Sequence, residues 1–157
     1  MATEDLTRAL DEAGTRYELL PHPETMSALA EADALGVDAA EVGKTLVVTT
    51  PEEHIRAVVP ANCRIDMHKL RDVVGSGGKK VHLLSEDDLA REYPEFDLGA
   101  VPPFGGARRD RVLVDSRVAE REKVVVEAGS HERSVRIGTD DLIRLTRAEV
   151  ADICEEP

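Results

Sequence analysis

The segment GAVPPFGG, residues 99–106, combines residue types that suit chemistry on a substrate. Proline fixes φ and lacks an N–H group, whereas glycine accepts positive φ and lets the backbone approach a ligand closely. Pro102, Pro103 and the three glycines therefore predict a rigid loop with a few free amides in set directions. Such amides can bind an anion or stabilise a developing oxyanion. A rigid turn without a function would have the same composition.

Three further places carry side chains that suit the same chemistry. Lys44 begins the apolar segment KTLVV, and an ammonium group at a strand end can hold a phosphate or a carbonyl oxygen. His22 lies between two prolines in PHPET, and Ser130 and His131 follow Gly129 in AGSH. Each place also has a simpler interpretation. Lys44 can be a solvated lysine at a strand end, His22 a loop histidine, and Ser130 and His131 ordinary residues of a hairpin turn.

Several better-known motifs do not fit. GSGGKK, residues 75–80, is similar to a phosphate-binding loop, but Val73 stands at the first glycine position and Lys80 at the Ser/Thr position. Cys63 and Cys154 are far apart, without a C-x-x-C pair or a histidine cluster, which argues against a zinc site or a disulfide framework. We therefore expect no metal ion, no other cofactor and no catalytic triad.

The chain is strongly acidic, with 32 acidic and 20 basic residues and a net charge of −12. A charge this far from zero favours solubility and adds self-repulsion. One interpretation is a cytoplasm of high salt, where the Debye length falls to about 3 Å at 1 M. The other is an acidic protein from a GC-rich genome, because arginine outnumbers lysine by 15 to 5.

The charge also bears on partners and location. Phosphate contacts come mostly from lysine and arginine, so the chain as a whole is not a general nucleic-acid binder. The local basic clusters are Lys79–Lys80 and the group Arg108, Arg109 and Arg111, and we expect both to flank the site. No apolar run approaches about 18 residues, so we expect no membrane span and no signal peptide, and a cytoplasmic location.

Periodicity and end signals indicate the elements that must position these residues. Helices are predicted over residues 4–13, 26–35 with Thr25 as its cap, 66–74, 85–93, 140–145 and 146–153. Strands are predicted over residues 17–20, 44–50, 54–59, 111–115, 123–128 and 133–137.

Two of the predicted strand pairs, 44–50 with 54–59 and 123–128 with 133–137, are joined by turn-rich segments and should form hairpins. Hairpins mixed with helices indicate an α+β fold with an antiparallel or mixed sheet, and not a regular βαβ alternation. The length of 157 residues fits one domain, over residues 1–157. Aromatic residues make up only 3% of the chain, so the core should be aliphatic.

The order of five segments resembles the YbaK/EbsC family, also called the prolyl-tRNA synthetase editing-domain or INS-like superfamily. The segments are HPETMSALAEADALGV (22–37), GKTLVV (43–48), LGAVPPFGG (98–106), VLVD (112–115) and EAGSHERSVRIGTDDLIRL (127–145). The resemblance covers nearly the whole chain. It implies a mixed, largely antiparallel, barrel-like sheet flanked by helices. It also implies a trans-acting deacylase that cleaves the ester between a wrong amino acid and the 3′-terminal adenosine of a tRNA.

The resemblance assigns roles to particular residues. Lys44 would hold the phosphate or ribose of the terminal nucleotide, the loop with Gly105 would supply amides, and His131 would orient substrate or water. An aminoacyl ester is already activated, so a positioned water and fixed donors suffice and no covalent nucleophile is needed. The other residues expected to shape the substrate pocket are His22, Thr25, Thr45, Gly99, Pro102, Pro103, Phe104, Gly129 and Ser130.

The substrate remains open at this point. Thr45 stands where an alanine-specific branch of the family has asparagine, and Pro102 where many relatives carry a small polar residue. Alanine, cysteine or serine on tRNAPro or a related tRNA all remain candidates, and an aminoacyl-tRNA synthetase is a candidate partner besides the CCA end of the tRNA. The alternatives are a catalytically silent module that binds tRNA or a nucleotide, and a regulatory protein with a small-molecule ligand.

Overall fold

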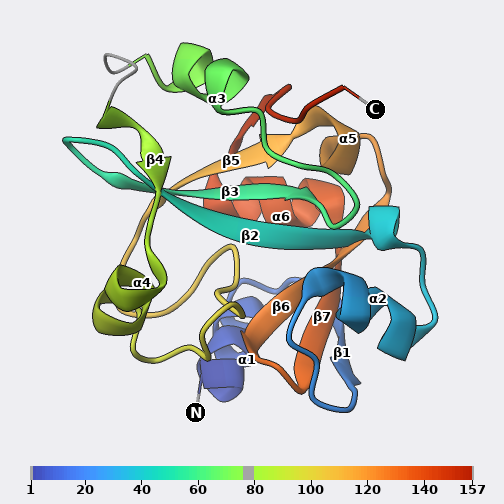
Figure 1. The fold of residues 1–157 in the computed structure, drawn as a ribbon. Helices are drawn as coiled ribbons and strands as arrows, with labels where there is room; N and C mark the ends of the chain where they lie inside the picture. Colours follow the sequence, from blue (N-terminus) through green and yellow to red (C-terminus); the bar gives the residue numbers. More distant parts are fainter. Residues whose placement is uncertain (1, 76–79, 157) are drawn as a thin grey trace.

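The computed structural model describes residues 2–75 and 80–156, in which helices pack around one mixed sheet (Figure 1). Lys79, one half of the predicted Lys79–Lys80 cluster, lies outside the described residues. The helices are α1 (Ala2–Glu12), α2 (Ala28–Leu35), the 3-10 helix η1 (Ala39–Glu41), α3 (Met67–Val74), α4 (Glu86–Glu92), α5 (Ser116–Ala119) and α6 (Thr139–Thr146). The strands are β1 (Tyr17–Pro21), β2 (Val42–Thr49), β3 (His54–Pro60), β4 (His82–Leu83), β5 (Arg111–Asp115), β6 (Lys123–Ser130), β7 (Arg133–Gly138) and β8 (Glu149–Ala151).

The strands lie in the order β1-β7-β6-β2-β3-β5-β8, with β4 paired to β2 beside this path. The pairs β1–β7, β6–β7, β2–β3 and β2–β4 are antiparallel, whereas β2–β6, β3–β5 and β5–β8 are parallel. This confirms the α+β class with a mixed, mostly antiparallel sheet flanked by helices. The sheet is not closed, because β1 and β8 form its two edges in the described part of the chain.

Both predicted hairpins are present, and β2 joins them into one sheet. Strand β2 pairs along its length with β3, and at Val42 and Gly43 it also pairs with β6. Gly43 makes this junction possible, since a Cβ atom there would lie 2.9 Å from Cγ1 of Val58 and 3.0 Å from Cγ2 of Val124. The residue after this close approach is Lys44, which pairs with Val59 of β3.

The core is aliphatic, as the composition predicts, and it has two main parts. On one face of the sheet, Leu6 and Leu10 of α1 and Leu142 of α6 pack against valines of β3, β5, β6 and β7. On the other face, Leu70 of α3 and Ile153 pack against β2, β3 and β5. Because both faces of the central strands are covered, these strands read as nearly continuous apolar runs in the sequence.

The predicted last helix, 146–153, is wrong. Helix α6 ends at Thr146, because Arg147 adopts the left-handed conformation with φ of 57° and its N–H bonds to the Ile143 carbonyl. The chain then pairs with the free edge of β5 as β8. Apolar spacing over so short a segment fits either structure, and the unpaired edge of β5 decides the outcome.

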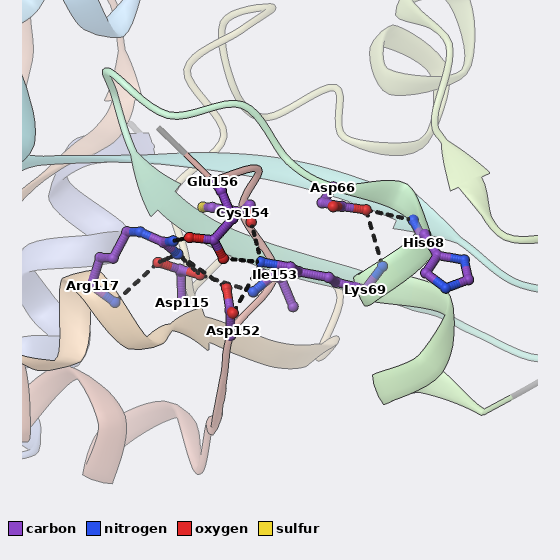
Figure 2. Close-up of polar contacts among 9 residues, drawn as sticks. All are labelled: Asp66, His68, Lys69, Asp115, Arg117, Asp152, Ile153, Cys154 and Glu156. Carbon is purple, nitrogen blue, oxygen red and sulfur yellow. Dashed lines mark hydrogen bonds and ion pairs between the residues drawn. The ribbon is translucent and has the colours of Figure 1, made fainter.

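Polar contacts hold the segment after β8 in place (Figure 2). The buried carboxylate of Asp115 accepts a hydrogen bond from the Ile153 amide at 2.9 Å and is paired with Arg117. The ammonium group of Lys69 bonds to Asp152, to the Cys154 carbonyl and to Glu156 at 2.7–3.0 Å (Figure 2). The buried Ile153 and Cys154 therefore reach the core beside α3.

One predicted helix start is also corrected. Ser27, not Thr25, caps α2 by accepting a hydrogen bond from the Ala30 amide at 3.1 Å. Thr25 is instead buried against the β6–β7 turn, where its amide donates to the His131 carbonyl at 3.0 Å. Within the described residues, no helix is long and apolar enough to cross a membrane.

Candidate functional site

Lys44 and Thr45 of β2 line a cavity of about 300 Å³. Its walls come from the first residues of α2, from β4 and α4, from the loop after α4 and from β6. The apolar lining consists of Ala28, Leu46, Val47, Leu83, Leu84, Leu89 and Val101, and the other lining residues are Ser27, Gly99 and Glu127. A small apolar cavity with a few convergent polar groups is the usual form of a ligand site.

Two polar groups at this cavity have no protein partner. Lys44 is half-buried, and its ammonium group forms no ion pair or hydrogen bond with any described residue. The buried hydroxyl oxygen of Thr45 also lacks a hydrogen-bond partner within the described part of the chain. Buried polar groups in proteins are nearly always hydrogen-bonded, so the Thr45 hydroxyl is an exception, and the Lys44 ammonium group has no protein partner to give up on binding a molecule.

The first half of the 99–106 loop is attached to the β6–β7 turn. The Asp97 amide donates to the Gly129 carbonyl at 2.9 Å, and the Asp97 carboxylate accepts from the His131 amide at 3.1 Å. Gly99, with φ of 84°, then turns the chain toward the cavity. The amides of Gly99 and Val101 donate to no acceptor among the described residues, so this part of the loop offers the free N–H groups that the sequence predicts.

The second half of the loop is held by a buried arginine that sequence reasoning missed. Arg56 of β3 donates to the carbonyl oxygens of Pro102 at 3.0 Å, Gly105 at 2.9 Å and Arg108 at 3.3 Å. Its Nε also pairs with the Asp110 carboxylate at 3.0 Å. The five N–H groups of a guanidinium can serve several acceptors at once, and here they determine the course of residues 102–110.

This second half does not line the cavity that contains Lys44. Pro103, Phe104 and Gly105 instead line a separate cavity of about 860 Å³, together with Arg108 and Arg109 among others. Pro102 is buried and gives its carbonyl to Arg56. The predicted pocket residues of the loop are therefore divided, with Gly99 at the smaller cavity and residues 103–105 at the larger one.

The predicted residues of the β6–β7 turn and of the segment after β1 lie together, behind the cavity wall. His131 is buried, its Nε2 is 2.6 Å from the Leu98 carbonyl oxygen, and a Cβ atom at Gly99 would lie 3.6 Å from Cε1 of its ring. Gly129 has φ of 88°, and Ser130 accepts a hydrogen bond from the Glu132 amide. His22, like Thr25, is anchored to this turn, since its amide donates to the Glu132 carbonyl at 2.9 Å.

Glu127 is the cavity residue to which sequence reasoning gave no role. It lies on β6 with 3% of its surface exposed, and Glu31 on α2, which has no exposed surface, is close enough to act on its carboxyl group. Burial first, and then the neighbouring Glu31, raise the pKa of Glu127 to about 9. The sequence does contain a signal for this residue. Glu127 is the one acidic residue in the apolar run VVVEA, residues 124–128, and a charged residue within an apolar strand is expected to be buried.

The predicted basic flank is partly neutralised. Arg108 pairs with Glu92 and Asp110, and Arg111 pairs with Glu149 at 2.7 Å. Arg109 and Lys80 are exposed. Within residues 2–75 and 80–156, no three histidine, cysteine, aspartate or glutamate side chains are arranged to hold a metal ion.

Comparison with known proteins decides the family. The family described as the aminoacyl-tRNA editing domain matches residues 22–145, which is most of the chain. The chain belongs to this family. The match begins at His22 and ends at Leu145, in the last turn of α6, so it includes Lys44, the 99–106 loop and Glu127.

Solved structures share the fold of this editing domain. A crystal structure described as a candidate trans-editing enzyme for prolyl-tRNA synthetase superposes with a TM-score of 0.86 at 23% identity, over 99% of this chain and 98% of that chain. The hypothetical protein APE2540 gives a TM-score of 0.87 at 24% identity, over 96% and 99% of the two chains. A signal transduction candidate from Marinobacter aquaeolei VT8 gives 0.69 at 15% identity, and there the similarity covers 98% of this chain but 31% of the other.

Proposed function

We propose that this editing domain is a trans-acting aminoacyl-tRNA deacylase that hydrolyses the ester between a small amino acid and the terminal adenosine of a tRNA. The observation that carries the proposal is one cavity lined by Lys44, whose ammonium group has no partner among the described residues, and by Gly99 and Val101, whose amides donate to no described acceptor. Membership of the editing family supplies the substrate class. We further propose that the whole chain acts as one domain in the cytoplasm, where tRNA is charged.

The cavity supports a mechanism without a covalent intermediate. Lys44 binds a phosphate or ribose oxygen of the terminal nucleotide and so orients the ester. A water oxygen adds to the carbonyl carbon, and the amides of Gly99 and Val101 stabilise the oxyanion that forms. The bond from the carbonyl carbon to the ribose oxygen then breaks, and the proton of the water passes to that oxygen. The products are the free amino acid and the tRNA with its ribose hydroxyl restored.

The size and lining of the cavity favour a small side chain. A volume of about 300 Å³ is at the lower end of the range for small-molecule sites. The walls from Leu46, Leu89 and Val101 are apolar. Apolar pockets separate side chains that differ by one methylene by only about 1–3 kcal/mol, so we propose alanine, cysteine and serine as the substrates to compare.

Part of the expected basic flank is not free to bind the rest of a tRNA. Arg108 and Arg111, expected at the flank, are already paired with carboxylates. We therefore propose that the domain binds chiefly the CCA end, and that a prolyl-tRNA synthetase contributes the remaining affinity as a partner.

The test is deacylation of Ala-, Cys- and Ser-tRNAPro, with Pro-tRNAPro as the correctly charged control. We expect fast release of at least one amino acid, and a loss of about 10²-fold in rate for Lys44→Ala, comparable with removal of one oxyanion donor. Lys123→Ala, an exposed lysine at the start of β6, is the matched control and should retain the wild-type rate.

The assay should be run at low and at molar KCl, because salt affects the binding of tRNA. Rates equal to spontaneous hydrolysis for every tRNA at both salt concentrations would contradict the proposal. Such rates together with tRNA binding would support the alternative of a silent binding module.

A further inference from the structure

The larger cavity, of about 860 Å³, has two arginines without a protein partner in its lining. Arg109 lies in the loop before β5, and Arg147 follows α6. Both are exposed, and neither side chain forms an ion pair or a hydrogen bond with any described residue. In a chain with a net charge of −12, this cavity therefore offers two positive charges that no described carboxylate pairs with.

The acidic residues of the same lining are already engaged. Asp110 pairs with Arg56 at 3.0 Å. Glu95 accepts a hydrogen bond from a loop amide at 2.7 Å, and the exposed Asp5 pairs with Arg8 at 3.4 Å. Each carboxylate of the lining thus has a partner other than the two free arginines, which are left to bind an anion from outside the chain.

Two loop amides add further donors to this lining. Gly105 and Gly106 line the cavity, and both have positive φ, of 87° and 83°. Their N–H groups donate to no acceptor among the described residues. Guanidinium groups and backbone N–H groups are common donors to phosphate oxygens. The lining therefore suits an anion with several oxygen atoms.

Arg147 has a backbone conformation that arginine rarely adopts. Its φ is 57°, and it is the only non-glycine residue with positive φ in the described part of the chain. Helices α2 and α3 end in the same conformation at Gly36 and Gly75, where no Cβ atom opposes it. Glycine at position 147 would therefore end α6 at lower cost. An unusual backbone at a residue with a free charge points to a role for the side chain.

The two cavities are neighbours along one loop. Val101 lines the cavity that Lys44 also lines, and Pro103 lines the larger cavity, so only Pro102 separates the two linings along the chain. Two residues of chain span at most about 7 Å. Successive phosphates of one strand are about 3.4 Å apart along the axis of a DNA duplex. The distance between the two linings is therefore compatible with one nucleic-acid strand that contacts both.

We propose that the larger cavity is a phosphate-binding site, in which Arg109, Arg147 and the amides of Gly105 and Gly106 bind the backbone of the tRNA strand that leads to the terminal adenosine. The assignment to tRNA rests on the proposed deacylase function, whereas the affinity for phosphate does not. A free nucleotide is the other source of the same chemistry, and binding measurements distinguish it from tRNA.

The first measurement is equilibrium binding of uncharged tRNAPro to the full chain at a series of KCl concentrations. Arg109→Met and Arg147→Gly should each weaken binding at low salt by up to about fivefold, the effect of one solvent-accessible ion pair. Each should also make the slope of log affinity against log salt less negative by about 0.7–0.9, because one phosphate contact is lost. Arg16→Met replaces an exposed arginine outside this lining, changes the net charge equally and should keep the wild-type slope.

Two readouts separate binding from a structural role. Arg147→Gly places a glycine in the left-handed conformation, so its melting temperature should be no lower than that of the wild type. In deacylation, Arg109→Met and Arg147→Gly should raise KM and leave kcat unchanged, because a phosphate contact is the same before and during the reaction. Lower melting temperatures with an unchanged salt slope would mean that the arginines support only the fold, and would overturn the proposal.

ATP and inorganic pyrophosphate test the other source of phosphate. We expect both to bind more weakly than tRNAPro at the same KCl concentration, since neither extends into the smaller cavity as well. Tighter binding of ATP than of tRNAPro, lost in Arg109→Met and Arg147→Gly, would overturn the assignment to tRNA in favour of a nucleotide.

The remaining outcomes keep this proposal apart from the deacylase function. A wild type that binds neither tRNAPro nor ATP overturns the phosphate site. Wild-type affinity and slope in folded Arg109→Met and Arg147→Gly overturn it as well, even where the chain is an active deacylase. The expected slopes in a wild type that hydrolyses no aminoacyl-tRNA overturn the deacylase function and leave the phosphate site in place.

Discussion

A carboxyl group that keeps its proton inside a folded chain makes stability depend on pH. The pKa of Glu127 rises from its ordinary value of 4.5 to about 9 on folding. Between these two pH values the folded chain holds a proton that the unfolded chain releases. The free energy of unfolding therefore decreases as the pH rises through this window, by at most about 1.4 kcal/mol per pH unit for this group.

Glu127→Gln should remove this dependence. We expect the variant to gain stability relative to the wild type as the pH rises from about 5 to about 9, with little difference below the ordinary glutamate pKa. Urea unfolding at a series of pH values measures the difference directly. Glu132→Gln is exposed and should follow the wild type at each pH. A constant difference between Glu127→Gln and the wild type would show that Glu127 is ionised in the folded chain.

At the scale of elements, the loop of residues 102–110 depends on one side chain. Arg56 is 1% exposed, serves three loop carbonyls and Asp110, and lies over the ring of Tyr93 at 5.4 Å. Among the described residues, no backbone hydrogen bond joins two residues of this loop. The shape of the loop is therefore set by a side chain of β3.

Arg56→Met should lower the free energy of unfolding by about 3–5 kcal/mol, because it leaves Asp110 buried beside unpaired carbonyls. Chemical denaturation measures the loss, and proteolysis of the folded variant should cut first within residues 102–110. Arg109→Met, an exposed arginine of the same loop, is the control and should change stability little. Equal effects of the two variants would mean that Arg56 does not hold the loop.

The local elements were predictable from the sequence, and the long-range pairing was less so. The two hairpins follow from β-branched runs beside turn residues, and these signals are local. Strand β8 was missed because its partner β5 is more than thirty positions away, as Leu113 with Glu149 shows. No local signal distinguishes three residues that pair with a free strand edge from the continuation of a helix.

For the candidate site, the sequence predicted the strand and the rigid loop that line the cavity, but not the buried charged residues near them. Lys44 and Gly99 meet at one cavity because a strand and a rigid loop place them there. Arg56 and Glu127 were missed for a common reason. Each is a single charged residue in an apolar strand, and its role depends on a residue distant in sequence. Arg56 pairs with Asp110, and Glu31 acts on Glu127.

At the scale of the whole molecule, the net charge of −12 opposes folding. Many of the described arginines are paired, as Arg111 is with Glu149 and Arg117 with Asp152, yet acidic residues exceed basic ones by twelve. Salt screens repulsion between exposed charges more than it weakens buried pairs.

The melting temperature should therefore rise from low to molar KCl. A gain of about 1 kcal/mol corresponds to about 2–4 °C for a chain of this size. A nonionic solute at the same osmolarity is the control, because it does not screen charge. A melting temperature that stays level or falls in KCl would mean that repulsion is already balanced, and would remove the case for a high-salt cytoplasm.

The polar contacts that hold the segment after β8 have a consequence for synthesis on the ribosome. The core around Leu113 and Ile55 is completed by Ile153 and Cys154, which Lys69 and Asp115 hold in place. A nascent chain that has not yet reached residue 153 exposes the apolar edge of β5 and one face of the central strands. Until those residues emerge, this apolar surface and unpaired strand edge are open to association with other chains.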